Sequence, residues 1–295
     1  MINFLFWNFR PRLSVKHPES ILARTALSFG IDLVILAENT APPENILIEL
    51  NCEDSTYEYA ADPNERFAVF TRFPGELLEP FEDHPRMSIR RLYLPMKKDI
   101  LVAIIHFPDK RNYSRSDQQS LSFELAAFLH EAEARAGHRR TILVGDFNMN
   151  PFEEGMVDAK GFGAMMTRDL ARRISSGGPV SRTRFYNPMW GRFGDMKEGP
   201  PGTFYHSQAN PTNIYWHMLD QVLVRPELID SFINESLRVL TKVDSRDGEL
   251  DLLEKKRKHW KVAVSDHLPI VFSMDFPEEI SYERPAGRLL ADSPG

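Results

Sequence analysis

Several polar residues of this 295-residue sequence stand directly beside strongly apolar segments, and their types are those that handle phosphate groups and divalent cations. They are Asn8 after MINFLFW, Glu38 after LVILA, His106 after LVAII, Asp146 and Asn148 at the end of TILVGDFN, Asp220 before QVLV, and Asp266 and His267 before LPIVF. If the apolar segments are strands of two packed sheets, the strand ends gather along one rim. Carboxylates, amides and imidazoles would then meet there, a combination typical of metal-assisted hydrolysis.

The residue types fit hydrolysis of a phosphodiester, which is anionic and repels nucleophiles. A hard cation such as Mg²⁺, held by a few carboxylate oxygens, offsets that charge, and Glu38 and Asp266 are the predicted ligands. Asp146 is predicted to orient and deprotonate the attacking water. Asn148 can donate an amide hydrogen to a phosphate oxygen without adding negative charge.

His267 and Asp220 are predicted to act as a pair, because a carboxylate that fixes the tautomer of an imidazole improves its contact with phosphate or water. Each residue also has a purely structural interpretation. Asp146 and Asn148 could terminate a strand as ordinary turn residues, Glu38 could begin a surface turn, and an isolated histidine such as His106 could be a rim residue. Their joint occurrence favours the catalytic interpretation.

Short apolar runs separated by turn residues predict a large β core with few helices. The predicted strands are Ile2–Trp7, Leu33–Ala37, Phe67–Thr71, Met87–Leu94, Ile100–His106, Thr141–Gly145, Leu219–Val224, Leu237–Thr241 and Leu268–Met274. One helix is predicted from a cap at Ser116 to Gly137, with an apolar face that includes Leu125 and Leu129. A second helix is predicted from Pro18 to Phe29. These helices cannot alternate one-for-one with the strands, which favours helices packed outside two stacked sheets.

Composition allows one large core: 42% of the residues are hydrophobic, and the length suits a single domain. We expect that domain to span residues 1–276, with residues 277–295 forming a surface tail. The net charge of −6 excludes a strong overall basic field. One cysteine rules out an internal disulfide framework. With no predicted leader and no membrane span, we expect a soluble, cytoplasmic protein.

The segment between about Met149 and Met218 is irregular and rich in glycine, proline, arginine and aromatic residues, which is more typical of a functional loop than of a linker. Its aromatic side chains could stack on unpaired bases while its arginines contact phosphates, or they could pack the segment onto the sandwich. The predicted substrate-binding residues are Arg184, Tyr186, Trp190, Phe204 and Tyr205.

These motifs together resemble the endonuclease/exonuclease/phosphatase superfamily. The resemblance rests on WN at Trp7–Asn8, the apolar-flanked Glu38, GDFN at Gly145–Asn148, LDQVLV at Leu219–Val224 and SDH at Ser265–His267, which occur in the order of the family. They span roughly residues 1 to 276. GDFN followed far downstream by SDH is a specific pair.

The resemblance implies a DNase I-like, four-layer α/β sandwich of two stacked mixed sheets flanked by helices, and divalent-metal-dependent cleavage of phosphoester bonds. It implies that Glu38 holds Mg²⁺, for which Mn²⁺ could substitute, with Asn8 and Asp266 close to the ion. It further implies that His267, paired with Asp220, contacts the scissile phosphate, and that His106 lies near the leaving group as in the DNase I-like and sphingomyelinase-like branches.

Departures from the family pattern narrow the branch. Ala37 precedes Glu38 where many members carry glutamine, and His106 begins HFPDKRNYSR where apurinic-site endonucleases have tyrosine and asparagine. Base-excision repair is therefore disfavoured. The extended signature segments of inositol polyphosphate 5-phosphatases are not evident either.

We therefore predict a metal-dependent phosphodiesterase, foremost a DNA or RNA nuclease. The alternative is a phosphatase or phosphodiesterase that acts on a small nucleotide, a lipid headgroup or a sugar phosphate. A catalytically silent binding module is disfavoured, because clustered like charges are relieved only by a cation. The sequence leaves open the oligomeric state, endonucleolytic against exonucleolytic action, and the choice between DNA and RNA.

Overall fold

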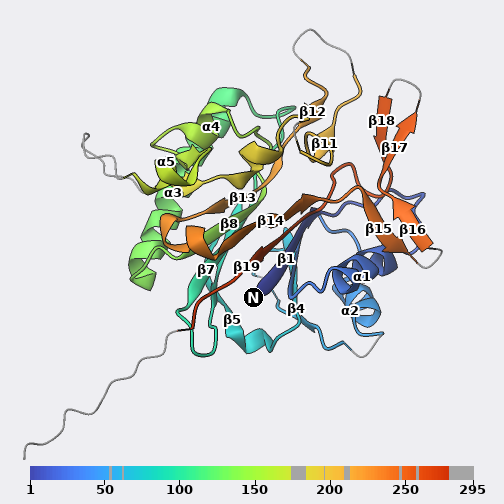
Figure 1. Ribbon diagram of the computed structural model, residues 1–295, viewed down its shortest axis with the longest axis horizontal. Helices are drawn as coiled ribbons and strands as arrows, with labels where there is room; N and C mark the ends of the chain where they lie inside the picture. The colour runs from blue at the N-terminus through green and yellow to red at the C-terminus, as the bar shows by residue number, and fades with distance from the viewer. Residues whose placement is uncertain are drawn as a thin grey trace, which may run out of the picture.

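The computed structural model contains two large mixed β-sheets packed face to face, with helices on their outer sides (Figure 1). It describes residues 1–52, 55–61, 63–173, 184–195, 197–208, 213–245, 248–256 and 259–278. Most of the predicted tail at 277–295 thus lies outside the described residues. The predicted sandwich of two stacked mixed sheets flanked by helices is confirmed.

Each sheet is built around strands that read as apolar runs in the sequence. The six-stranded sheet contains, in spatial order, β14 (Phe232–Val239), β19 (Ile270–Met274), β1 (Ile2–Asn8), β2 (Leu33–Ala37), β4 (Phe67–Thr71) and β3 (Glu58–Tyr59). The seven-stranded sheet contains β5 (Leu78–His84), β6 (Met87–Leu92), β7 (Ile100–His106), β8 (Thr141–Asp146), β13 (Asp220–Val224), β10 (Phe185–Tyr186) and β9 (Ala164–Met165).

Each sheet contains one parallel pair whose two strands are joined by a helical crossover, and the two-residue strands β9 and β10 form a further parallel pair in the seven-stranded sheet. Helix α1 (Pro18–Ser28) connects β1 to β2, and helix α3 (Arg115–Ala136) connects β7 to β8. Parallel strands end at the same edge of a sheet. Consequently the residues that end or follow β1, β2, β7 and β8 lie on one side of the molecule.

The period-2 alternation of strand side chains separates two apolar layers. In β7, Val102 and Ile104 pack between the sheets, whereas Leu101, Ala103 and Ile105 pack on the outer face. Helix α3 covers that outer face with the predicted side chains, which include Leu125 and Leu129. On the other side, α1 and α2 (Pro43–Leu50) cover the six-stranded sheet (Figure 1).

Smaller elements complete the described chain. They are the hairpins β11 (Phe204–Tyr205)–β12 (Trp216–His217), β15 (Lys242–Ser245)–β16 (Gly248–Asp251) and β17 (Leu253–Lys256)–β18 (His259–Val262), the helices α4 (Glu154–Val157) and α5 (Arg168–Arg172), and the 3-10 turns η1 (Gly75–Leu77), η2 (Pro188–Arg192) and η3 (Pro226–Ser231). Among the described residues, no helix is long and apolar enough to cross a membrane.

The predicted helix cap at Ser116 is wrong by two residues. Ser114 is the cap: its hydroxyl accepts a hydrogen bond from the Asp117 amide, and the Asp117 carboxylate accepts one from the Ser114 amide. Two serines at this spacing compete for the same role, and the reciprocal capping box decides in favour of the first. The helix ends at Ala136, and Gly137 adopts the left-handed conformation that favours glycine.

Candidate active site

Strand register brings the predicted polar residues together at the common edge of the two sheets. His106 pairs with Asp146 across the parallel β7–β8 ladder, and Asp220 pairs with Asp146 across the antiparallel β8–β13 ladder. In the other sheet, Asn8 pairs with Ala37, so Glu38 follows at the same level. The six-stranded sheet therefore contributes Asn8, Glu38 and the two residues shortly before β19, Asp266 and His267. The seven-stranded sheet contributes His106, Asp146, Asn148 and Asp220.

Asp146 is the centre of the cluster and is fully buried. Its Oδ2 accepts a hydrogen bond from Asn8 Nδ2 at 2.9 Å and one from Asn148 Nδ2 at 3.1 Å, and its Oδ1 accepts from the Asn148 amide at 2.8 Å. Burial, partly offset by the charge of His267, raises the pKa of this carboxyl. A carboxylate held by two amides lies here at the junction of the sheets.

Two imidazoles face the same oxygen of Asp146. His106 Nε2 and His267 Nε2 each lie 3.9 Å from Asp146 Oδ2. His106 Nε2 also lies 3.1 Å from Glu38 Oε1, and this hydrogen bond is the main reason that the pKa of Glu38 falls to about 2. Histidines and carboxylates thus form one continuous network across the sheet boundary.

His267 is oriented by Asp220, as the sequence predicts. Its Nδ1 lies 2.8 Å from Asp220 Oδ2, which leaves Nε2 directed at Asp146. Burial lowers the pKa of His267, but the charges of Asp220 and Asp146 outweigh that effect and raise it to about 10. These two carboxylates thus favour the imidazolium form of His267.

Local backbone geometry supports this arrangement. Glu38 and Asn148 both adopt left-handed backbone conformations, with φ of 51° and 50°. A non-glycine residue in that region carries strain of about 1–3 kcal/mol, and such residues concentrate at functional sites. The left-handed conformation of Glu38 turns the chain immediately after β2. Asn8 Nδ2 donates a hydrogen bond to Glu38 Oε1 there at 3.3 Å.

Asp266 is placed differently from the other predicted ligands. Its side chain is exposed, and it belongs to neither of the two groups whose ligand atoms lie within 4.8 Å of one another: Glu38, His106 and Asp146, and Asp146, Asp220 and His267. Its charge still contributes to the raised pKa of His267. The structure thus keeps Asp266 beside the cluster without bringing it into contact.

The predicted substrate-binding residues separate into two groups. Phe204 contacts the site: it forms a β-bridge with His267, and the two rings lie 5.0 Å apart. Tyr205 follows it in β11, and Trp190 lies in η2 beside β13. Arg184 and Tyr186 lie elsewhere.

Tyr186 pairs with Val224, four residues along β13 from Asp220, which corresponds to roughly 13 Å at the rise of a strand. Its side chain is buried and packs against Phe232, and Arg184 donates to the Leu170 carbonyl. The prediction that these two side chains contact substrate is not supported by their positions, because short strand β10 folds this part of the segment into the sheet.

Three residues that sequence reasoning left without a role hold the site together. Trp7 Nε1 donates to the His267 carbonyl at 2.9 Å, and the Ser265 hydroxyl donates to the Asn8 carbonyl at 2.8 Å. The Thr203 hydroxyl accepts hydrogen bonds from the amides of Leu219 and Asp220, both at 3.1 Å. Trp7 and Ser265 lie within the WN and SDH motifs, and Thr203 begins the TFYH segment at Thr203–His206 that supplies the predicted substrate-binding residues Phe204 and Tyr205.

Two arginines lie near the more exposed carboxylates of the site. Arg10 Nη1 lies 3.3 Å from Glu38 Oε2. The pKa of Arg111 is raised by its hydrogen bond to Asp109 and, to a lesser extent, by the charges of Asp266 and Glu38, so its guanidinium lies in the field of the site. An anionic ligand would meet cations at the edge of an otherwise acidic centre.

Two stacked mixed sheets and a buried cluster of carboxylates and imidazoles at their shared edge define a phosphoester hydrolase of the DNase I-like fold. The sequence matches the Endonuclease/Exonuclease/phosphatase family over residues 7–267. The chain belongs to this family. No curated protein matches the sequence.

Solved structures share the fold at low sequence identity. Truncated Caenorhabditis elegans TDP2 is 12% identical, with a TM-score of 0.52 over 92% of this chain and 97% of that one. The human Nocturnin catalytic domain with bound sulfate is 15% identical, with a TM-score of 0.52 over 94% of both chains. D. rerio TDP2 complexed with single-strand DNA product is 13% identical, with a TM-score of 0.50 over 93% of this chain and 98% of that one.

Proposed function

We propose that this protein is a divalent-metal-dependent phosphodiesterase whose substrate is DNA or RNA. One observation carries the proposal: two imidazoles, one of them oriented by Asp220, face a single oxygen of the buried carboxylate Asp146. A structural core has no need for three carboxylates and two histidines in mutual contact. A site that handles a proton and an anionic ester requires this combination.

The donor set fits Mg²⁺ or Mn²⁺. Both ions prefer oxygen ligands. The carboxylates of Glu38 and Asp146 lie near each other, because both accept a hydrogen bond from Asn8 Nδ2. The Oδ1 atom of Asn8 is buried without a hydrogen-bond partner, which is costly unless a cation or another donor meets it. A bound divalent cation would neutralise charge on the phosphate. Glu38 and Asn8 would hold it, with Asp266 close by.

The remaining residues supply positioning and proton transfer. Asp146, fixed by Asn8 and Asn148, is placed to orient a water and accept its proton. His267, protonated and held by Asp220, presents its Nε2–H to a phosphate oxygen. His106, whose Nε2 lies 3.9 Å from the same oxygen of Asp146, would act near the leaving group.

A nucleic-acid substrate is supported by Phe204 beside His267, since a partly exposed aromatic ring next to the reacting phosphate can hold a base. The D. rerio TDP2 structure, which shares the fold, contains a single-strand DNA product. The net charge of −6 favours the second candidate, a small phosphate ester, because little long-range attraction for a polyanion is available.

The test is a cleavage panel in Mg²⁺, Mn²⁺ or chelator. It offers single- and double-stranded DNA, RNA, a generic aryl phosphodiester and several small phosphomonoesters. His267→Ala runs beside the wild type, with His84→Ala on the outer strand β5 as the matched control. We expect metal-dependent cleavage of a polynucleotide that falls at least about 100-fold in His267→Ala and persists in His84→Ala.

Activity confined to small esters would favour the second candidate. Equal cleavage in chelator, or an unaffected His267→Ala variant, would contradict the proposed metal-dependent mechanism.

A further inference from the structure

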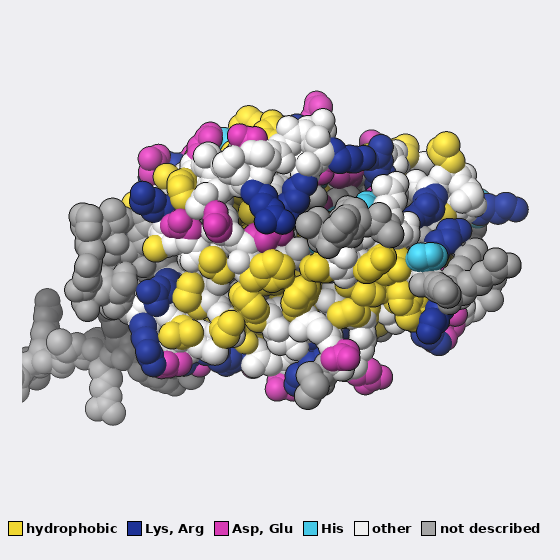
Figure 2. All heavy atoms as spheres, turned by 90° about the horizontal axis from the view of Figure 1, so that it is seen from above, with side chains coloured by type: hydrophobic (Ala, Val, Ile, Leu, Met, Phe, Trp, Pro, Cys, Tyr) yellow, Lys and Arg dark blue, Asp and Glu magenta, His cyan; other side chains and the backbone are white. Residues whose placement is uncertain are grey.

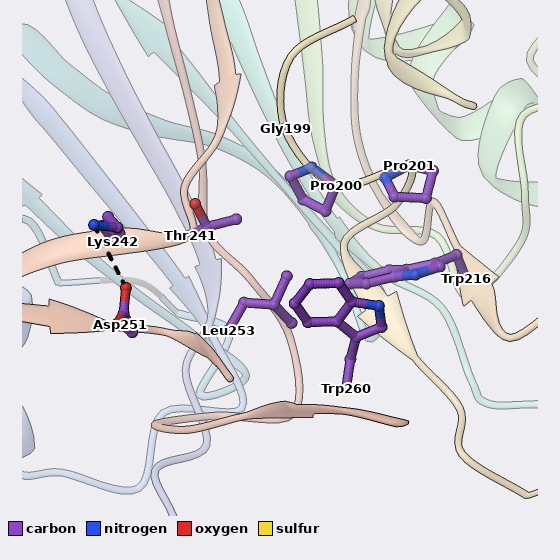
Figure 3. A pocket seen from close by; sticks show the side chains of 9 residues that line it. All are labelled: Gly199, Pro200, Pro201, Trp216, Thr241, Lys242, Asp251, Leu253 and Trp260. Atoms are coloured by element: carbon purple, nitrogen blue, oxygen red, sulfur yellow. Dashed lines mark ion pairs between the residues drawn. The ribbon is translucent and has the colours of Figure 1, made fainter. Parts of the chain in front are cut away.

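A cavity of about 320 Å³ lies between the β11–β12 hairpin and the hairpins formed by β15 to β18. Its volume is at the lower end of the range for small-ligand sites. The side chains around it include Pro200, Pro201, Trp216, Thr241, Leu253 and Trp260. Figure 3 shows the two indole rings side by side, with the two prolines across from them and Leu253 next to Trp260.

The β11–β12 hairpin links this cavity to the catalytic cluster. In the hairpin register, Phe204 pairs with His217 and Tyr205 pairs with Trp216. Side chains alternate between the two faces of a strand pair. Phe204 packs on His267, whereas Tyr205 and Trp216, whose rings lie 5.1 Å apart, face the opposite way. One face of the hairpin therefore borders the catalytic histidine and the other borders the cavity.

The aromatic surface extends beyond a single ring. Trp216 and Trp260 have ring centroids 6.4 Å apart, and Tyr205 stacks on Tyr215 at 6.2 Å. Both tryptophans are partly exposed, and Tyr215 is exposed. Four aromatic side chains from three strands and a loop thus form a continuous surface that leads away from the catalytic cluster.

One lysine with no acidic partner among the described ion pairs lies beside the Trp260 ring. Lys255 Nζ lies 5.6 Å from the Trp260 ring centroid, and Lys255 is exposed on strand β17. Lys242 contacts Glu249 at 2.6 Å and Asp251 at 3.7 Å, so its charge is already compensated. Seen from above, the molecule shows a band of apolar side chains with both basic and acidic side chains beside it (Figure 2).

From these observations we infer that the cavity binds an unpaired nucleobase. This base belongs to the same nucleic-acid strand as the phosphate that lies at the catalytic cluster. The base stacks on Trp216 or Trp260, and Lys255 meets the adjoining phosphate. The inference rests on the proposed function and specifies its substrate as single-stranded nucleic acid. An apolar cavity alone would equally suit a proline-rich peptide, but its continuity with the catalytic histidine through β11 favours the nucleic acid.

Binding is tested separately from cleavage. A fluorescently labelled single strand of about 12 nucleotides, within the usual site sizes of single-strand binders, is titrated with protein in chelator, where cleavage is blocked. Trp260→Ala and Trp216→Ala are each expected to weaken binding about tenfold, the loss of one base-stacking contact. Trp260→Phe keeps a ring and is expected to recover most of the affinity. Tyr59→Ala, on the edge strand β3 of the six-stranded sheet, is the matched control and should change nothing.

Steady-state kinetics then separate this role from a merely structural one. Trp260→Ala should raise KM for the oligonucleotide about tenfold with kcat within twofold of the wild type, and leave cleavage of the aryl phosphodiester unchanged. Circular dichroism and melting temperature verify that each variant is folded.

Unchanged oligonucleotide affinity in both folded tryptophan variants would overturn the inference. It would also be overturned if a proline-rich peptide bound more tightly than the oligonucleotide and both tryptophan substitutions abolished that binding. Failure of the proposed function has a different signature: no polynucleotide is cleaved by the wild type under any metal condition. Tryptophan-dependent binding in chelator would survive that failure.

Discussion

Gly145 marks how closely two strands approach beneath the proposed catalytic residues. A Cβ atom built on Gly145 would lie 1.9 Å from the Ile105 carbonyl oxygen, so any side chain there must push β7 and β8 apart. These are the strands that place His106 and Asp146 side by side. The close packing of β7 and β8 thus requires glycine at position 145, independently of any role of the GDFN motif in catalysis.

Gly145→Ala is expected to destabilise the fold by at least about 3 kcal/mol, the upper range of overpacking, and to reduce activity of the fraction that remains folded. The measurement is urea unfolding at equilibrium. Gly191→Ala is the matched control, since a Cβ there meets nothing within 4 Å. Equal stability of the two variants would show that the strands are not held at this separation.

Glu38 offers a residue-scale test of cation binding that does not depend on knowing the substrate. A cation that binds only the folded state stabilises it by RT ln(1 + [L]/Kd), which is about 2.7 kcal/mol at 100-fold excess over Kd. We expect Mg²⁺ to raise the melting temperature of the wild type and to have little effect on Glu38→Gln.

Glu79→Gln, an exposed carboxylate on β5, is the control and should respond to Mg²⁺ like the wild type. A wild-type melting temperature that is identical with Mg²⁺ and with chelator would argue against a cation at Glu38.

At the scale of elements, a buried ion pair fixes helix α3 to the end of β13. Arg225 Nε lies 2.7 Å from Glu133 Oε1, and both side chains are almost completely buried. Burial alone would raise the pKa of Glu133, but the charge of Arg225 and hydrogen bonds from His130 and Arg225 lower it to about 2. Helix α3 is thereby held against the strand that begins with Asp220.

Glu133→Gln should cost about 3–5 kcal/mol, because removing one partner leaves a buried guanidinium uncompensated. Since the folded-state pKa of Glu133 lies below its ordinary value, the carboxylate contributes its stability above about pH 4.5 and loses it as the pH falls towards 2. The difference in unfolding free energy between wild type and Glu133→Gln should therefore shrink over that interval.

Denaturant titrations at a series of pH values measure this difference. Asp169→Asn, which breaks an exposed ion pair with Arg173 on α5, should change stability by less than about 1 kcal/mol at every pH. A pH-independent difference for Glu133→Gln would mean that the pair does not stabilise the charged carboxylate.

Elements with strong local signals could be predicted from sequence, and those fixed by distant partners could not. Strands such as Leu33–Ala37 and Ile100–His106 agree with prediction because they are buried on both faces and read as unbroken apolar runs. The β14 strand begins at Phe232, five residues before its predicted start, because part of it is exposed and polar. Helix α2 is only eight residues long and was not predicted.

The grouping of polar residues at strand ends follows from the same apolar runs, which is why Asn8, Glu38, His106 and Asp146 meet as the sequence suggests. The burial of Tyr186 cannot be predicted from the sequence, because its position depends on pairing with Val224, nearly forty residues away. Such non-local pairing leaves no periodic signature in a two-residue strand.

At the scale of the whole molecule, charge limits how a polyanion can bind. The net charge is −6, and basic residues near the site are already engaged: Arg10 with Glu38, Lys110 with Glu153 and Arg111 with Asp109. Few phosphates can therefore be neutralised without disrupting an existing ion pair.

We expect the affinity for a single-stranded oligonucleotide to fall with salt at a log–log slope of about −2, equivalent to roughly three phosphates at −0.7 each. Anisotropy titrations between about 0.05 and 0.2 M salt measure it. Lys255→Gln should make the slope shallower by roughly 0.7. A wild-type slope steeper than about −5 would indicate an extended basic surface that the structure does not contain among its described residues.

The position of β19 between β14 and β1 has a consequence for synthesis in the cell. Ribosomes make a chain from its amino end, and Trp7 and Asn8 obtain their partners His267 and Ser265 only when some 260 further residues have followed. Until then β1 has an open edge and Asp220 has no imidazole to orient. A nascent chain that stops short of residue 265 therefore lacks both His267 and the last strand of the six-stranded sheet, so the candidate site can form only when synthesis is almost finished.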